Sequence, residues 1–143
     1  MRRDVLVGIV GVSLTLAAVP LYAHHAFSAE FDADKPLKLQ GSVVKTEWVN
    51  PHAWIHIAVK QPDGTTREWM IEGGTPNTLM RRGVSRDTLK IGTEVVVTGY
   101  QAKDGSNRAN GRDISYPDGR KLFLGSTGTG APYEQESKDA DKK

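Results

Sequence analysis

The stretch from residue 52 to residue 60 places the strongest constraint on the fold of this chain. Its odd-numbered positions carry the aliphatic residues Ala53, Ile55, Ile57 and Val59. A period of two is that of a β-strand with one face in a core. The turn sequence Pro62-Asp63-Gly64 follows directly and is typical of a hairpin. We therefore expect a mainly β fold in which this strand returns on itself.

Other segments have the same character. Strands are predicted at 37–49, 52–60 and 66–72, a turn leading into a fourth strand within 91–100, a fifth strand at 112–116 and an edge strand at 121–124. Gly41 interrupts the first of these segments and indicates a bulge or sharp bend. Thr75-Pro76 is a helix-start sequence, because a capping hydroxyl precedes a proline in the first turn, and the predicted helix ends at Arg82. Three strands, one short helix and two further strands form the order of a small five-stranded OB-fold-like barrel.

The first 23 residues predict a secretory signal peptide. Arg2-Arg3 supplies positive charge, Val5 to Val19 is apolar, and Ala23 offers a small residue at the cleavage site. An uncleaved membrane anchor is the alternative, but the apolar run is short against the roughly 20 residues of a membrane span. We therefore expect cleavage after Ala23, and a periplasmic or secreted protein that no longer contacts the membrane.

The rest of the chain divides by composition. We expect an irregular N-terminal arm at 24–36, the OB-fold-like domain at 37–125 and a disordered tail at 126–143, where glycine, serine, threonine and charged residues dominate. The chain has no cysteine, which excludes disulfides and thiolate metal sites. Its formal net charge of +2 over 143 residues gives no electrostatic footprint for nucleic acid.

Three short motifs carry a resemblance to a known family. They are His24 to Phe27, Asn50 to His52 and Lys103 to Asn110. Together with the strand order, they make the region from about His24 to Ser126 similar to a family of exported bacterial proteins that is known only as a domain of unknown function. The resemblance implies export and an OB-fold-like domain, and it brings no activity with it.

The four histidines are the candidate metal ligands: His24, His25, His52 and His56. Cleavage after Ala23 would make His24 the N-terminus, where the free amine and the imidazole can chelate one metal in a histidine brace. His25 offers a second, amine–amide–imidazole chelate. Nitrogen donors of this kind favour Cu(II). His52 and His56 share a strand face about 13 Å apart, so only one of them, by preference His52, is expected to join the metal.

Two alternatives remain open at this stage. The histidines at 52 and 56 can be ordinary solvent-facing residues, and the protein can be a recognition module for a peptide, a glycan or an unidentified periplasmic partner. For that second function the candidate ligand-binding residues are Trp54, Arg108 and Arg112. No catalytic motif is present, so we expect a binding protein more than an enzyme.

Overall fold

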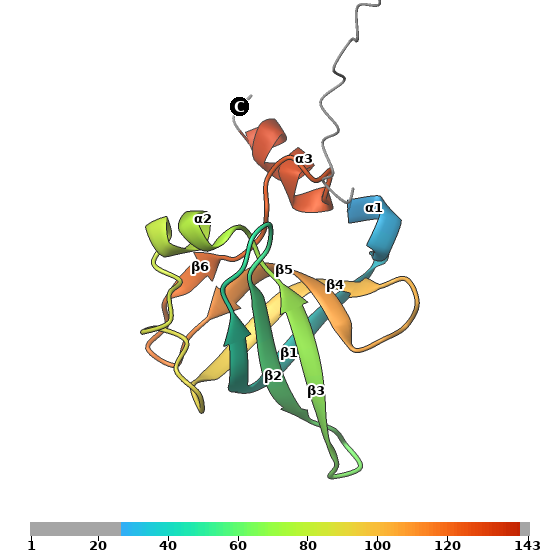
Figure 1. Cartoon of the computed structure of the whole chain (residues 1–143). Helices are drawn as coiled ribbons and strands as arrows, with labels where there is room; N and C mark the ends of the chain where they lie inside the picture. The colour runs from blue at the N-terminus through green and yellow to red at the C-terminus, as the bar shows by residue number, and fades with distance from the viewer. Residues whose placement is uncertain (1–26, 141–143) are drawn as a thin grey trace, which may run out of the picture.

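The structure is a computed structural model that describes residues 27–140. This part of the chain is mainly β, with six strands and a few short helices (Figure 1). In chain order the elements are α1 (Phe27–Glu30), β1 (Phe31–Glu47), β2 (Trp54–Lys60), β3 (Thr66–Glu72), α2 (Pro76–Arg81), β4 (Glu94–Ala102), β5 (Arg108–Ser115), β6 (Lys121–Phe123) and α3 (Pro132–Ala140).

The strands follow the order β3-β2-β1-β4-β5-β6, and every neighbouring pair in this order is antiparallel. One further pairing is parallel and joins Met70–Glu72 of β3 to Arg108–Asn110 of β5. Each of the strands β1 to β4 therefore has two hydrogen-bonded neighbours, and β5 has three. The short helix α2 lies between β3 and β4 in the chain, as the sequence predicted.

The start of α2 confirms the expected cap. Thr75 has an extended backbone, and its Oγ1 accepts a hydrogen bond from the amide of Thr78 at 3.3 Å. Pro76 follows in the first turn, where a missing amide proton costs nothing. The hydroxyl thus satisfies one of the amides that a helix N-terminus leaves without a partner.

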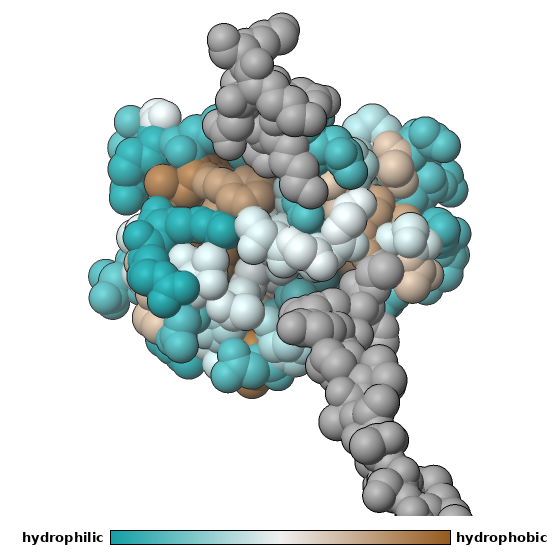
Figure 2. Space-filling view, turned by 90° about the horizontal axis from the view of Figure 1, so that it is seen from above, coloured by the Kyte–Doolittle hydropathy of each residue, from teal (hydrophilic) through white to brown (hydrophobic). Residues whose placement is uncertain are grey.

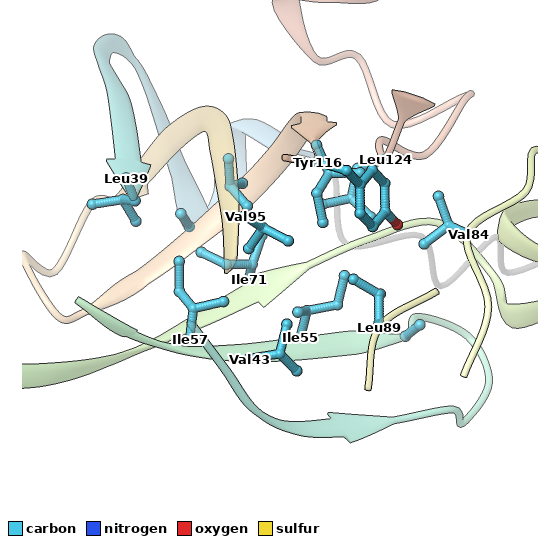
Figure 3. Packing of buried hydrophobic residues seen from close by; sticks show 14 of the residues in the cluster. Leu39, Val43, Ile55, Ile57, Ile71, Val84, Leu89, Val95, Tyr116 and Leu124 are labelled. Carbon is cyan, nitrogen blue, oxygen red and sulfur yellow. The ribbon is translucent and has the colours of Figure 1, made fainter. Parts of the chain in front are cut away.

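The main core confirms the alternation along the second strand. Ile55, Ile57 and Val59 of β2 are buried and contribute to one apolar cluster with residues from β1, β3, β4 and β5. Figure 3 shows labelled side chains from β1, β2, β3 and β4, among them Ile71 and Val95, converging with others from the segments between the strands. The side chains of the even-numbered residues of β2, among them Trp54 and His56, lie on the opposite face of the strand.

Gly41 has a different role from the predicted bulge. The register irregularity between β1 and β2 lies at Val43 to Lys45, and Gly41 itself is regularly paired. A Cβ atom at Gly41 would lie 2.3 Å from the carbonyl oxygen of Ala58. The glycine is therefore required by the close approach of the two strands.

The predicted irregular arm at 24–36 is wrong for its described residues. Residues 27–30 form α1, and β1 already begins at Phe31, which pairs with Ala102 of β4. The physical reason is a second apolar cluster, in which Phe27 and Phe31 pack with Tyr100 and Tyr133. Their burial holds this segment against the sheet. The predicted signal peptide, His24 and His25 lie outside the described residues.

The prediction of a disordered tail from residue 126 is also wrong for the part that the structure describes. Ser126, Thr129, Ala131 and Tyr133 are buried, and α3 follows. The amide of Phe27 donates a hydrogen bond to the carbonyl of Thr129 at 2.8 Å. A few buried contacts thus tie this segment down, although its composition is that of a flexible chain.

Candidate functional site

His52 lies in the loop between β1 and β2, which reaches the end of the sheet where α1 and α3 lie (Figure 1). Its Nδ1 is 3.1 Å from the carbonyl oxygen of Gly73 and 3.2 Å from Oγ of Ser126. Because a carbonyl can only accept, Nδ1 carries the ring proton and Nε2 carries a lone pair. Within residues 27–140, Nε2 of His52 has no hydrogen-bond partner. The side chain is 12% exposed, so the nitrogen is held in a fixed place.

A buried polar network continues from His52. Oε1 of Glu72 lies 3.9 Å from Nδ1 of His52. Asn110 donates through Nδ2 to the same oxygen at 3.5 Å, and the Tyr133 hydroxyl donates to Oδ1 of Asn110 at 3.0 Å. Burial raises the pKa of Glu72 above its ordinary value and raises the pKa of Tyr133 to about 12. The network therefore links His52 to Tyr133, which lies after β6 near the C-terminal end of the described residues.

His56 has very different surroundings. Its Nδ1 is 2.6 Å from Oε1 of Glu68 on β3, and its Nε2 is 3.1 Å from Oε1 of Glu47 on β1. The side chain is 5% exposed, so the solvent-facing alternative is wrong for this residue. Lys45 also binds Glu47, and this hydrogen bond lowers the pKa of the carboxyl. Both ring nitrogens of His56 are thus already in contact with carboxylates.

The structure does not bring His52 and His56 together. No group of three or more histidine, aspartate or glutamate side chains within residues 27–140 has the geometry to hold a metal ion. Within residues 27–140, His52 therefore has no complete set of side-chain donors for a metal ion. His24 and His25 are the histidines that remain.

The expected ligand-binding residues separate into two places. The Arg108 guanidinium lies 5.4 Å from the centre of the Trp54 ring and forms an ion pair with Glu30 at 2.8 Å. Arg112 instead contacts Glu136 of α3 and, at 3.6 Å, Asp113. The structure thus groups Trp54 with Arg108 and leaves Arg112 apart.

A cleft of about 610 Å³ lies beside Arg112, between Arg82, Phe123 and Tyr133 among other residues. Figure 2 looks onto this end of the molecule, where hydrophilic surface surrounds smaller apolar areas. Arg82 donates to the carbonyl of Gly125 at 2.7 Å and stacks 4.6 Å from the centre of the Phe123 ring. Because both guanidinium groups of the cleft have partners within the protein, we assign no ligand to it.

Serine, histidine and carboxylate meet near His52, but not as a hydrolytic triad. A triad needs the nucleophile at one ring nitrogen and the carboxylate at the other. Here Ser126 and Glu72 both lie at Nδ1 of His52. This arrangement orients an imidazole and does not activate the serine.

Sequence reasoning missed Glu68, Glu72, Ser126 and Tyr133. A signal for the two glutamates was present in the Pro62-Asp63-Gly64 turn, which sets the hairpin register. In that register Trp54 faces Glu72, and Glu68 lies diagonally from His56. For Ser126 and Tyr133 there was no local signal, because both lie in a segment of flexible composition.

No helix among residues 27–140 combines the length and the apolar character that crossing a membrane requires. The comparisons with curated proteins and with solved structures found no match. A family model does match residues 12–111, which is more than half of the chain. The description of that model is a family of unknown function, DUF6152. The chain therefore belongs to this family, whose function its description leaves open.

Proposed function

We propose that this protein is exported and binds one Cu(II) ion through the amine and imidazole of a processed N-terminal His24, together with Nε2 of His52. It would act as a copper carrier or buffer in the periplasm, since the described residues around His52 form no catalytic arrangement. The proposed site combines the N-terminus that signal-peptide cleavage would create with His52, whose ring is already oriented by the fold.

Export is supported by the leader alone. Arg2-Arg3, the apolar run from Val5 to Val19 and the small residue Ala23 have the order of a cleavable signal peptide. The absence of cysteine is compatible with an oxidising compartment. Cleavage after Ala23 is the step that would turn His24 into a bidentate ligand.

The proposed scaffold is an OB-fold-like barrel. Its support is the ring of pairings, in which β1 pairs with β2 and β4, and β3 pairs with β2 and β5. The parallel pairing of β3 with β5 and the position of α2 between β3 and β4 fit the same architecture. Such a scaffold keeps the loop that carries His52 at one end of the sheet.

The observation that carries the metal proposal is the state of the His52 ring. Metal-binding histidines usually donate their other ring proton to a carbonyl or carboxylate, which directs the lone pair of the ligating nitrogen to the metal. His52 meets this condition, because Nδ1 contacts Gly73 and Nε2 has no partner within residues 27–140. His56 does not meet it, because carboxylates contact both of its nitrogens. We therefore leave His56 out of the metal coordination.

Chain length allows His24 to reach His52. Phe27 is hydrogen-bonded to Thr129, and Ser126, three residues earlier, contacts His52. Three steps along an extended chain span at most about 10 Å, so Phe27 lies within about that distance of Ser126. His24 lies three steps before Phe27 in the sequence, so the intervening chain is long enough to return across the same distance. His25 provides the alternative chelate with the terminal amine and its own imidazole.

Copper is favoured by the donor set. An amine and two imidazoles are nitrogen donors, for which Cu(II) has the highest affinity among the common divalent metals. The chain has no cysteine to favour Cu(I) or a zinc–thiolate site. Because the donors bind only when deprotonated, affinity is expected to fall on acidification.

The test is a Cu(II) titration of protein with its native processed N-terminus, established by intact mass. One tight site is expected. One extra residue before His24 should abolish the brace, and His52→Gln should lower affinity by about tenfold or more. His56→Gln is the matched control and should bind copper as the unaltered protein does. An affinity that the extension leaves unchanged would overturn the proposal.

The alternative is a recognition module, and the contact between Trp54 and Arg108 favours it. A stacked guanidinium and indole can together receive an aromatic or anionic group of a peptide, a glycan or a partner protein. Here Arg108 also pairs with Glu30, so a ligand would have to compete with that carboxylate. A protein with the native N-terminus that binds no copper would favour this second function.

A further inference from the structure

We propose that Glu72 and Ser126 are positioning residues that hold His52 in the tautomer with its proton on Nδ1, and that the C-terminal segment is thereby part of the binding site. The inference rests on the proposed function and extends it to residues that do not contact the metal. We define the C-terminal segment as residues 126–136.

Three oxygen atoms surround Nδ1 of His52. They are the carbonyl oxygen of Gly73 at 3.1 Å, Oγ of Ser126 at 3.2 Å and Oε1 of Glu72 at 3.9 Å. The Ser126 hydroxyl is also 3.3 Å from the Gly73 carbonyl and can donate to it. In the other tautomer, the lone pair of Nδ1 would face the carbonyl and the carboxylate, and this arrangement is repulsive. The surroundings therefore favour a proton on Nδ1 and a free lone pair on Nε2.

Glu72 is held in place by strand pairing and by the buried network. On β3 it is the register partner of Trp54, and Asn110 on β5 donates to its carboxylate. Tyr133 in turn donates to Asn110. The carboxylate is 11% exposed, so solvent screens its effect on the His52 ring only weakly.

The C-terminal segment reaches His52 by two routes. One is direct, through Ser126, and the other passes from Tyr133 through Asn110 to Glu72. The Tyr133 ring also packs edge-on against Phe123, with the ring centres 5.3 Å apart. Glu72 and Gly73 from the middle of the chain and Ser126 from the C-terminal segment therefore surround one imidazole. Because binding couplings are reciprocal, metal binding at His52 and docking of this segment should stabilise each other.

The first experiment measures the His52 tautomer in metal-free protein by ¹⁵N NMR of the imidazole, at a pH above about 8 where an ordinary histidine is neutral. The unaltered protein should show the proton on Nδ1. Glu72→Gln and Ser126→Ala should each raise the population with the proton on Nε2. Glu68→Gln is the matched control, since it makes the same change on the same strand beside His56. It should leave the His52 signals unchanged.

The second experiment measures Cu(II) affinity in the same three variants with the native N-terminus. Loss of an orienting partner typically weakens metal binding by about 10- to 100-fold, and we expect at least about tenfold for Glu72→Gln. The control Glu68→Gln should bind as the unaltered protein does. A His52 tautomer that neither variant changes would overturn the inference while leaving the proposed function intact. A lack of copper binding in the unaltered protein would overturn the proposed function, whereas the NMR result, obtained without metal, would still decide the positioning role.

Discussion

His52 and His56 lie four positions apart in the sequence, yet their surroundings have almost nothing in common. His56 is held by the sheet, between a carboxylate on β1 and a carboxylate on β3. His52 is held by a loop, by the end of β3 and by Ser126, which is 74 residues away in the chain. Both ring nitrogens of His56 contact carboxylates, whereas within residues 27–140 only Nδ1 of His52 has a partner. Because β2 begins only at Trp54, His52 lies in the loop before it, and the spacing of the two histidines in the sequence does not predict their partners.

The difference has a physical origin in where each partner comes from. Strand register is repetitive, so the residues that flank His56 follow from the pairing of β1, β2 and β3. The surroundings of His52 depend on the packing of the C-terminal segment against the second apolar cluster. We call these two places the sheet region, around His56, and the terminal region, around His52.

The largest expected effect comes from removing packing in the terminal region alone. Tyr133→Ala should destabilise the protein by about 3 kcal/mol, because it removes a buried ring from the second cluster. Chemical denaturation measures the loss. NMR signals of His52 should change and those of His56 should not. Tyr133→Phe, which keeps the ring and loses the hydroxyl, should cost only about 1 kcal/mol. Equal changes at both histidines would show that the regions are not independent.

A smaller effect compares the histidines directly. His56→Ala should destabilise the protein by about 2 kcal/mol, because it removes two hydrogen-bonded contacts and leaves Glu47 and Glu68 facing each other. His52→Ala should cost about 1 kcal/mol, since within residues 27–140 only its Nδ1 is hydrogen-bonded. Lys45→Ala is the control, because it alters an exposed ion pair beside His56 and should change the denaturation midpoint very little. A larger loss for His52→Ala than for His56→Ala would reverse the comparison.

The last effect is absent at neutral pH and develops only in alkaline solution. Burial raises the pKa of Tyr133 to about 12 from an ordinary value of 10.0. The unfolded chain therefore releases this proton first as the pH rises, so stability present below pH 10 is lost between about pH 10 and pH 12. Denaturation curves across this range should fall less steeply for Tyr133→Phe than for the unaltered protein. Parallel curves would mean that the hydroxyl ionises equally easily in both states.

Much of the scaffold could be predicted from local pattern. The alternation in residues 52–60, the turn at Pro62-Asp63-Gly64 and the cap at Thr75 correspond to β2, its hairpin with β3 and the start of α2. These features depend on short-range rules of period and backbone geometry. The terminal segments were predicted incorrectly because their order depends on a few buried aromatic residues, such as Phe27 and Tyr133, within otherwise polar sequence.

By itself, then, the sequence determined a mainly β domain, the candidate set of four histidines and the absence of any thiolate ligand. Only the tertiary structure decided that His56 is enclosed by Glu47 and Glu68, and that His52 keeps Nε2 free of partners among residues 27–140. The reason is that hydrogen-bond partners of a side chain are set by which segments pack together. Residues as distant as His52 and Ser126 meet only once the whole chain has folded.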